Sequence, residues 1–342
     1  MPSQPTSSRP VPLLEYALLL GLATLWGASF AFLKIAVASI PPMTAIAVRT
    51  ALAGALLLAV MQWRGMRLPL DRTSLRSFFV VSIVNTVAPF MLIAWGLQFV
   101  DAGLAVILNS TTPIFAFLIT FATMALGGNT TGGGHDAITP RKLFGVAAGI
   151  TGIVLIVGAE ALAGLGRQLL PQIAIVVASV SYATSALYGR TFRSMSPLAP
   201  AAGSLLIGAG LLTPLALIVE QPWLARPTGA SVLSLVFLGL VCTALGNVLY
   251  FRLLGTLGSL GTTAQSYLRV PIGVLTGIVL LDEKLTPTAA LGLVCVVAGV
   301  AAMTITVPMP RYLAVMQVPA WAWRLRDKAE RLGARMRASC RW

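Results

Sequence analysis

Long apolar stretches make up most of this chain, and short polar joints separate them. Each stretch is close to the roughly 20 helical residues that cross a bilayer core. Proline and serine mark several of the joints, as at Ile40-Pro41-Pro42, Ser196-Pro197 and Thr286-Pro287. The pattern predicts ten helices, over residues 13–38, 42–62, 74–99, 101–126, 141–159, 170–190, 197–219, 230–253, 259–281 and 287–307.

The composition points to the same class of protein. Of 342 residues, 57% are hydrophobic and only 10% are charged, whereas a soluble domain carries about 25% charged residues. A soluble protein with an unusually large core could not keep so many stretches of this length away from water. We therefore expect an all-α polytopic membrane protein with ten transmembrane helices.

The basic residues predict the orientation of these spans. Ten spans place both termini on one side, and most of the lysines and arginines fall in the joints on that side or in the C-terminal tail. The opposite side has only Arg167, Arg226 and Lys284 in its joints. By the positive-inside rule, both termini are cytoplasmic. The net charge of +14 is therefore explained by the orientation of the chain in the membrane and does not indicate nucleic-acid binding.

The two ends of the chain differ from its middle. Residues 1–12 form a Pro/Ser-rich segment, and the apolar stretch after it is too long for the core of a signal peptide, so we expect it to remain as the first span. Residues 308–342 form a basic tail with "AWAWRLRDKAERLGARMRASCRW". The tail has the composition of an interfacial helix on anionic lipid, and equally that of a solvated segment.

The two halves of the apolar region show an internal repeat. Aligning Pro113 with Pro271 also aligns Gly103 with Gly261. Further along, "RKLFGVAAGITG" lies against "TAALGLVCVVAG", which pairs two further glycines in each half. We therefore divide the chain into repeat 1, residues 13–163, and repeat 2, residues 168–307.

Each repeat has five predicted helices, so the second repeat enters the membrane from the opposite face. Inverted repeats of this kind recur in secondary transporters, whose substrate site lies near the bilayer midplane at the interface between the repeats. The repeat therefore predicts a transporter.

Two blocks of the sequence carry a family resemblance. "LWGASFAFLK" followed by "IPPMTAIAVRTALAGALLL", and "VPIGVLTGIVLLDEKLTPTAALGLVCVVAG", resemble the EamA-type branch of the drug/metabolite transporter superfamily. The resemblance implies ten helices and export of small metabolites, without naming the substrate. The joint "LGGNTTGGGHDAITP" departs from the family pattern, because it lacks the glutamate that members often have there. The family's recurring residues fall here on Trp26, Gly27, Lys34, Arg49, Pro271 and Glu283.

Three basic residues lie inside predicted spans, while no acidic residue lies at the middle of one. Lys34 is close enough to a helix end to extend its amine to the membrane surface. Arg49 is expected to bind carbonyl groups or to pair with Asp101. Arg269 lies near the middle of 259–281, where an ionisable residue is costly and therefore a functional candidate. It either caps backbone carbonyls within the bundle or binds an anionic substrate group, since guanidinium matches a carboxylate bidentately.

Polar and aromatic residues within the spans complete the candidate substrate site. Singly, such residues more often join helices than bind ligands, but here they gather on helices expected to surround a central site. Besides Arg269, the candidates are Trp26, Phe30, Asn85, Asn109, Tyr182, Asn247, Tyr250, Gln265 and Tyr267. Pro113 and Pro271 are the expected hinges.

The function we expect is secondary transport by alternating access, with export of amino acids or other carboxylate-bearing solutes. Efflux of cationic or hydrophobic drugs, and a channel or scaffold role, are the alternatives. An enzyme is not expected, because His135 is the single histidine and no span pairs a nucleophile with a base. No cofactor or metal is expected, since the three cysteines lack CxxC spacing.

The expected partners are a small-molecule substrate and membrane lipid, with anionic headgroups at the tail, and no nucleic acid. The glycine spacings Gly145/Gly149 and Gly273/Gly277 are expected to pack helices within the chain, which then forms a monomer or a weak dimer. The expected location is a bacterial inner membrane, with multiple spans.

Overall fold

A computed structural model describes residues 13–125, 140–162, 169–188, 192, 195–256 and 265–304. Within them every regular element is helical, which confirms the all-α class. The segment 1–12 and the tail 308–342 lie outside the described residues. The α-helices are α1 (Leu13–Val37), α2 (Pro42–Trp63), α3 (Arg72–Val81), α4 (Ala88–Gly96), α5 (Ala102–Asn109), α6 (Thr112–Ala125), α7 (Pro140–Leu162), α8 (Leu169–Tyr188), α9 (Leu198–Val219), α10 (Gly229–Phe237), α11 (Gly246–Thr256), α13 (Gln265–Leu281) and α14 (Pro287–Thr304).

Three shorter helical elements complete this inventory. Two π-helical segments, η1 (Ser82–Val87) and η4 (Leu238–Leu245), continue α3 into α4 and α10 into α11. A short 3₁₀ turn, η3 (Pro222–Leu224), follows α9. Hydrophobic periodicity does not distinguish a π turn from an α turn, so the sequence pattern predicted these two runs as plain helices.

Within the described ranges, seven helical runs are long and apolar enough to cross a membrane, and three shorter apolar helices accompany them. Large apolar side chains on these helices are exposed, including Ile218 at 73% and Leu233 at 72%. Apolar exposure along helices of this length fits contact with lipid tails and not with water. Trp63 and Trp223 are exposed at helix ends, where aromatic residues gather at membrane interfaces. The chain is a polytopic membrane protein.

The predicted joints are confirmed by the helix ends. Pro42 occupies the first turn of α2, where its missing N–H costs nothing. The Asp71 side chain accepts a hydrogen bond from Ser74 N at 2.9 Å and so begins α3. Hydrogen bonds from Ser74 hold the pKa of the Asp71 carboxyl below its usual value.

The helix predicted over 101–126 is interrupted, so the prediction of one continuous helix was wrong. It stops at Asn109 and resumes at Thr112. The Ser110, Thr111 and Thr112 hydroxyls donate to the carbonyls of Ile107, Leu108 and Asn109 at 2.6, 2.7 and 2.8 Å. Pro113 supplies no N–H to continue the ladder. Competition from these side chains and the missing donor explain the break.

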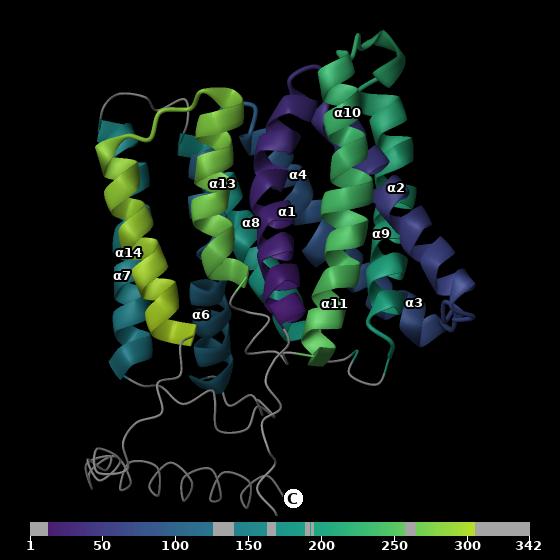
Figure 1. The fold of residues 1–342 in the computed structure, drawn as a ribbon, viewed down its shortest axis with the longest axis horizontal. Coiled ribbons are helices and arrows are strands. Elements are labelled where there is room, and N and C mark those ends of the chain that lie inside the picture. Colours follow the sequence, from purple (N-terminus) through teal and green to yellow (C-terminus); the bar gives the residue numbers. More distant parts are fainter. Residues whose placement is uncertain are drawn as a thin grey trace, which may run out of the picture. The chain divides into compact units, whose positions relative to one another are not determined.

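The helices pack in a defined set of pairs (Figure 1). The most extensive contacts join α7 to α14, α2 to α9 and α1 to α13. Helix α8 packs against α4, α5 and α6, while α1 also packs against α10, η4 and α11. In Figure 1, α1 accordingly lies between α13 on one side and α10 and α11 on the other. This arrangement gives α1 packed neighbours on both of these sides.

Glycines allow α7 and α14 to pack backbone against backbone. A methyl group added at Gly152 would lie 2.9 Å from Gly292 O, and one added at Gly299 would lie 2.6 Å from Gly145 O. Gly149 faces the Ile114 side chain and Gly273 faces Val106. The expectation that both glycine spacings pack helices within the chain is confirmed.

We expect Gly299→Leu to destabilise the protein, because the added side chain has no room between the two backbones. Overpacking of this kind costs about 1–3 kcal/mol or more, so the thermal unfolding midpoint in detergent should fall by several degrees. Gly210→Leu in α9 is the matched control, since nothing lies within 4 Å of a methyl group at Gly210. Equal midpoints for the two variants would contradict the tight α7–α14 contact.

Candidate functional site

The Arg269 side chain lies on α13 in contact with the interrupted helix α5–α6. Its Nη2 atom lies 3.4 Å from Asn109 Oδ1, which is at the outer limit of a hydrogen bond. Its Nε atom is buried and has no hydrogen-bond partner among the described residues. The residue as a whole is only half-buried. This cation therefore retains donor capacity that the described residues do not use.

Asn109 links Arg269 to α8. Its Nδ2 atom donates to Ser179 Oγ at 3.3 Å, and Ser179 Oγ also lies 3.3 Å from the carbonyl oxygens of Leu108 and Asn109. Tyr182 follows Ser179 by about one helical turn and interacts electrostatically with Arg269. The structure thus brings together three of the candidate site residues, Arg269, Asn109 and Tyr182.

A second arginine lies near the same tyrosine. Arg49 is buried on α2, donates from Nε to Thr243 Oγ1 at 2.8 Å, and has its guanidinium carbon 4.2 Å from the centre of the Phe90 ring. Tyr182 interacts electrostatically with Arg49 as well as with Arg269. The predicted pairing of Arg49 with Asp101 is wrong, because the Asp101 carboxylate binds Lys34 instead.

Neither arginine forms an ion pair with a carboxylate among the side chains that the structure describes. Acidic residues elsewhere in the described chain bind other groups. Glu220 accepts hydrogen bonds from the backbone N–H groups of Met43 and Thr44 at 2.9 and 2.7 Å and so caps α2. Asp71 caps α3. Glu15, Asp101 and Glu283 pair with other bases.

The two π-helical segments present backbone carbonyls to neighbouring side chains. Trp26 Nε1 donates to Cys242 O at 3.1 Å, and Asn247 Nδ2 donates to Thr243 O at 2.6 Å. Ser181 Oγ donates to Val84 O at 2.8 Å, next to the half-buried Asn85 in η1. Single π turns inside α-helices are frequent at functional sites.

The remaining candidates are more scattered than we predicted. The Trp26 and Tyr250 rings lie 5.5 Å apart in a small cluster with Leu19, Leu22 and Leu253. Phe30 is buried in the main apolar core. Gln265 is buried at the start of α13. The side chain of Tyr267 lies outside the described part of the chain.

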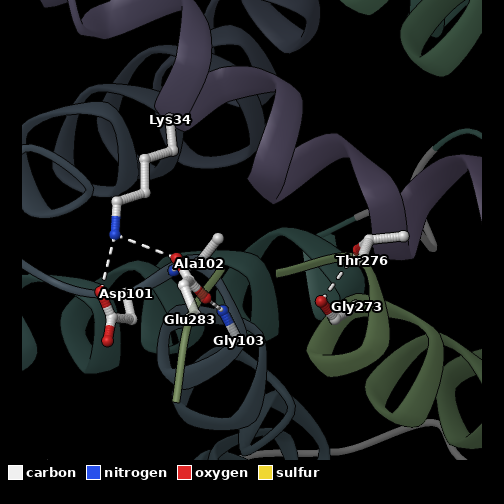
Figure 2. A network of polar contacts seen from close by, with 7 residues as sticks. All are labelled: Lys34, Asp101, Ala102, Gly103, Gly273, Thr276 and Glu283. Carbon is white, nitrogen blue, oxygen red and sulfur yellow. Dashed lines mark hydrogen bonds and ion pairs between the residues drawn. The ribbon is translucent and has the colours of Figure 1, made fainter. Parts of the chain in front are cut away.

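A polar cluster at the C-terminal end of α1 was not predicted (Figure 2). Lys34 Nζ lies 2.8 Å from Asp101 Oδ1 and 3.0 Å from Glu283 Oε1. Glu283 Oε1 also accepts from Ala102 N at 2.7 Å, and Oε2 accepts from Gly103 N at 2.9 Å. We call Lys34, Asp101, Glu283 and these two N–H groups the Lys34 cluster. Lys34 therefore pairs within the protein and does not extend freely to the membrane surface.

A second ion-pair cluster lies at the N-terminal end of α1. Glu15 Oε1 accepts from Arg252 Nη2 at 3.1 Å, and Glu15 Oε2 accepts from Thr256 Oγ1 at 2.9 Å. We call these three residues the Glu15 cluster. The sequence contained signals for both clusters, namely Glu15 and Lys34 near the two ends of one predicted span, but not the identity of their partners.

Comparisons with known proteins agree with this architecture. A model of the EamA-like transporter family matches residues 13–158 and 169–305. The chain belongs to the EamA-like transporter family. This EamA-like protein is 28% identical over 294 residues to the "uncharacterized inner membrane transporter YedA" of Escherichia coli K12, covering 85% of this chain and 90% of YedA. The predicted superfamily is thereby confirmed. Membership of a transporter family supports the prediction that the protein is not an enzyme.

Relatives of this EamA-like chain that have a substrate in their names include an amino-acid exporter. The "probable terminal-alkyne amino-acid exporter" of Streptantibioticus cattleyicolor is 27% identical over 212 residues, which cover 61% of this chain and 66% of the exporter. Among solved structures, one titled "Crystal structure of protein" has a TM-score of 0.56 and 19% identity, covering 84% of this chain and 97% of the other. That structure supports the fold alone.

Proposed function

We propose that this protein is a secondary transporter that exports small carboxylate-bearing solutes, amino acids among them, by alternating access. The observation that carries the proposal is Arg269, a half-buried guanidinium whose Nε has no partner among the described residues. A buried cation without a counter-charge is costly. A carboxylate that accepts its N–H groups bidentately would offset this cost.

The packing of the helices supports ten spans in two inverted repeats, 13–163 and 168–307. If α8 corresponds to α1, the contact of α8 with α4 corresponds to that of α1 with α11, and the contacts of α8 with α5 and α6 correspond to that of α1 with α13. The pairs α2–α9 and α7–α14 each join equivalent helices. Thr228 caps α10 through Ser231 N as Asp71 caps α3 through Ser74 N, and a π-helix follows in both.

We propose further that both termini are cytoplasmic, as the distribution of basic residues suggests. The break between Asn109 and Thr112 supports a hinge at Pro113, next to the Arg269 contact. Pro271, two residues after Arg269 within α13, is the second proposed hinge. Interrupted helices at the centre of a bundle are a recurrent way of building transporter sites.

The substrate site proposed here comprises Arg269, Asn109 and Tyr182, with the other candidate residues forming its walls. Asn109 and Tyr182 supply the amide and hydroxyl groups that orient a polar ligand. The name of the amino-acid exporter is consistent with a carboxylate as the recognised group. The absence of a carboxylate beside Arg49 or Arg269, among the described side chains, disfavours cationic drugs.

Counterflow in proteoliposomes tests this proposal. Vesicles preloaded with one unlabelled solute are exposed to the same labelled solute, across a panel of amino acids, organic anions and cationic dyes. We expect saturable accumulation of labelled carboxylates, because a carrier exchanges an internal unlabelled molecule for an external labelled one. Accumulation of cations alone would overturn the assignment of substrate class, and uptake that does not saturate or show trans-stimulation would indicate a channel.

A further inference from the structure

The Glu283 carboxylate is held more tightly than a surface ion pair requires. Its side chain is 8% exposed and accepts hydrogen bonds from Lys34 and from the first two N–H groups of α5. The N-terminus of a helix favours a negative charge, because its N–H groups are unpaired and its dipole is positive there. Glu283 thus connects the loop after α13 with both α1 and α5.

The local backbone is arranged to place this carboxylate. Asp282 has φ of +54°, a left-handed conformation that is unfavourable for a residue other than glycine. A methyl group at Gly277 would collide with Glu283 Oε2, and one at Gly103 would touch the same atom at 3.5 Å. Glu283 N bonds back to Gly277 O at 3.3 Å. Backbone strain of this kind persists where a specific placement is needed.

The Glu15 cluster connects α1 to a different element. Glu15, which is 4% exposed, bonds to Arg252 and Thr256 of α11, whereas the Lys34 cluster joins α1 to α5 and to the end of α13. At 1.5 Å per residue, the two clusters are about 28 Å apart along α1. Both are closed in this structure. One helix is therefore fastened at its two ends to two different sets of helices.

We propose that the two clusters are the gates of the transport cycle and that they open alternately, with Glu283 holding the gate at the C-terminal end of α1 closed. This inference rests on the proposed alternating-access function, which requires one end of the bundle to open while the other stays shut. The Lys34 cluster is suited to reversible opening. Lys34 is 26% and Asp101 57% exposed, so water reaches both partners and opening does not leave the lysine unsolvated.

The test measures the distance between spin labels at Ala38→Cys and Lys284→Cys, two exposed positions that flank the Lys34 cluster. The native cysteines are replaced by serine, and the label pair is measured by double electron–electron resonance in lipid nanodiscs. We expect Glu283→Gln to raise a longer-distance population about tenfold, within the usual range of conformational coupling. A neutral amide cannot hold Lys34 and both N–H groups at once.

Lys34→Gln is the second variant, because it breaks the ion pair but leaves Glu283 to cap α5. It should also enlarge the longer-distance population if the cluster is a gate. Asp101→Asn, which removes the more exposed partner, should have a much smaller effect. Glu15→Gln should leave this distance unchanged, because it loosens the opposite end.

An unchanged distance distribution in both Glu283→Gln and Lys34→Gln, in folded protein, would overturn the gate and make the cluster a static brace. The gate would also be overturned if Glu15→Gln lengthened the distance between the labels as much as Glu283→Gln did. The readout needs no substrate. Failure of counterflow with every solute would therefore overturn the proposed function separately, whether or not the labels move.

Discussion

Replacement of Arg269 by leucine is expected to reduce carboxylate counterflow by about two orders of magnitude or more. The guanidinium would form charge-assisted hydrogen bonds to the substrate, and loss of one partner from a buried charged pair costs about 3–5 kcal/mol. Each 1.4 kcal/mol corresponds to about a tenfold change in binding. Initial rates at substrate concentrations well below saturation would measure the loss.

Arg269→Lys should retain part of the activity, because the charge remains while the bidentate geometry is lost. Arg64→Leu, at an exposed arginine after α2, is the control and should transport normally. The folded state provides a second control. Since the Arg269 Nε atom has no partner among the described residues, Arg269→Leu should keep or raise the thermal unfolding midpoint. Normal transport together with a marked loss of stability would instead show that Arg269 braces the bundle.

Gly27→Val is expected to prevent correct packing of α1 against α13. A methyl group at Gly27 would lie 2.7 Å from Arg269 O and 3.1 Å from Gly273 N, both backbone atoms that cannot rotate away. The two helices would have to separate at the level of the proposed substrate site. We expect a cost at or above the upper end of the 1–3 kcal/mol range for overpacking, and loss of counterflow even in the fraction that folds.

Thermal unfolding of the purified protein in detergent would measure this effect. Gly21→Val is the matched control, because Gly21 lies on the same helix and nothing lies within 4 Å of a methyl group there. The control should unfold within a degree or two of the parent protein. If Gly27→Val unfolded at the same temperature as Gly21→Val, the close α1–α13 approach would be wrong.

The positions of the helices followed from the apolar stretches and their punctuation. Each predicted range overlaps described helices, and Pro42, Pro197 and Pro287 lie at or beside the helix starts. The interruption of the helix predicted over 101–126 has a signal only at the break itself. Three consecutive residues with hydroxyl side chains precede a proline there. That signal is the run "NSTTP" at residues 109–113. The π-helical segments had no comparable signal.

The contacts of the charged residues could not be predicted in the same way. The sequence allowed several partners for Arg49 and for Lys34. Which partner each side chain binds depends on which helices are neighbours in the fold. Asp101 pairs with Lys34 because the start of α5 lies beside the end of α1. Glu283 binds both Lys34 and the first N–H group of α5 at the same place. Arg49 instead met Thr243 and Phe90, from segments that are far from it in the chain.

The sequence by itself determined the class of protein, the approximate helix positions and the family, because these depend on apolar length, local punctuation and motifs within single helices. The tertiary structure decided which groups meet: Arg269 with Asn109 and Tyr182, Glu283 with Lys34 and α5, and Gly27 with the backbone of α13. The physical reason is that hydrophobicity acts residue by residue along the chain. Hydrogen bonds, ion pairs and steric contacts depend on distances of a few ångströms between helices that lie far apart in sequence.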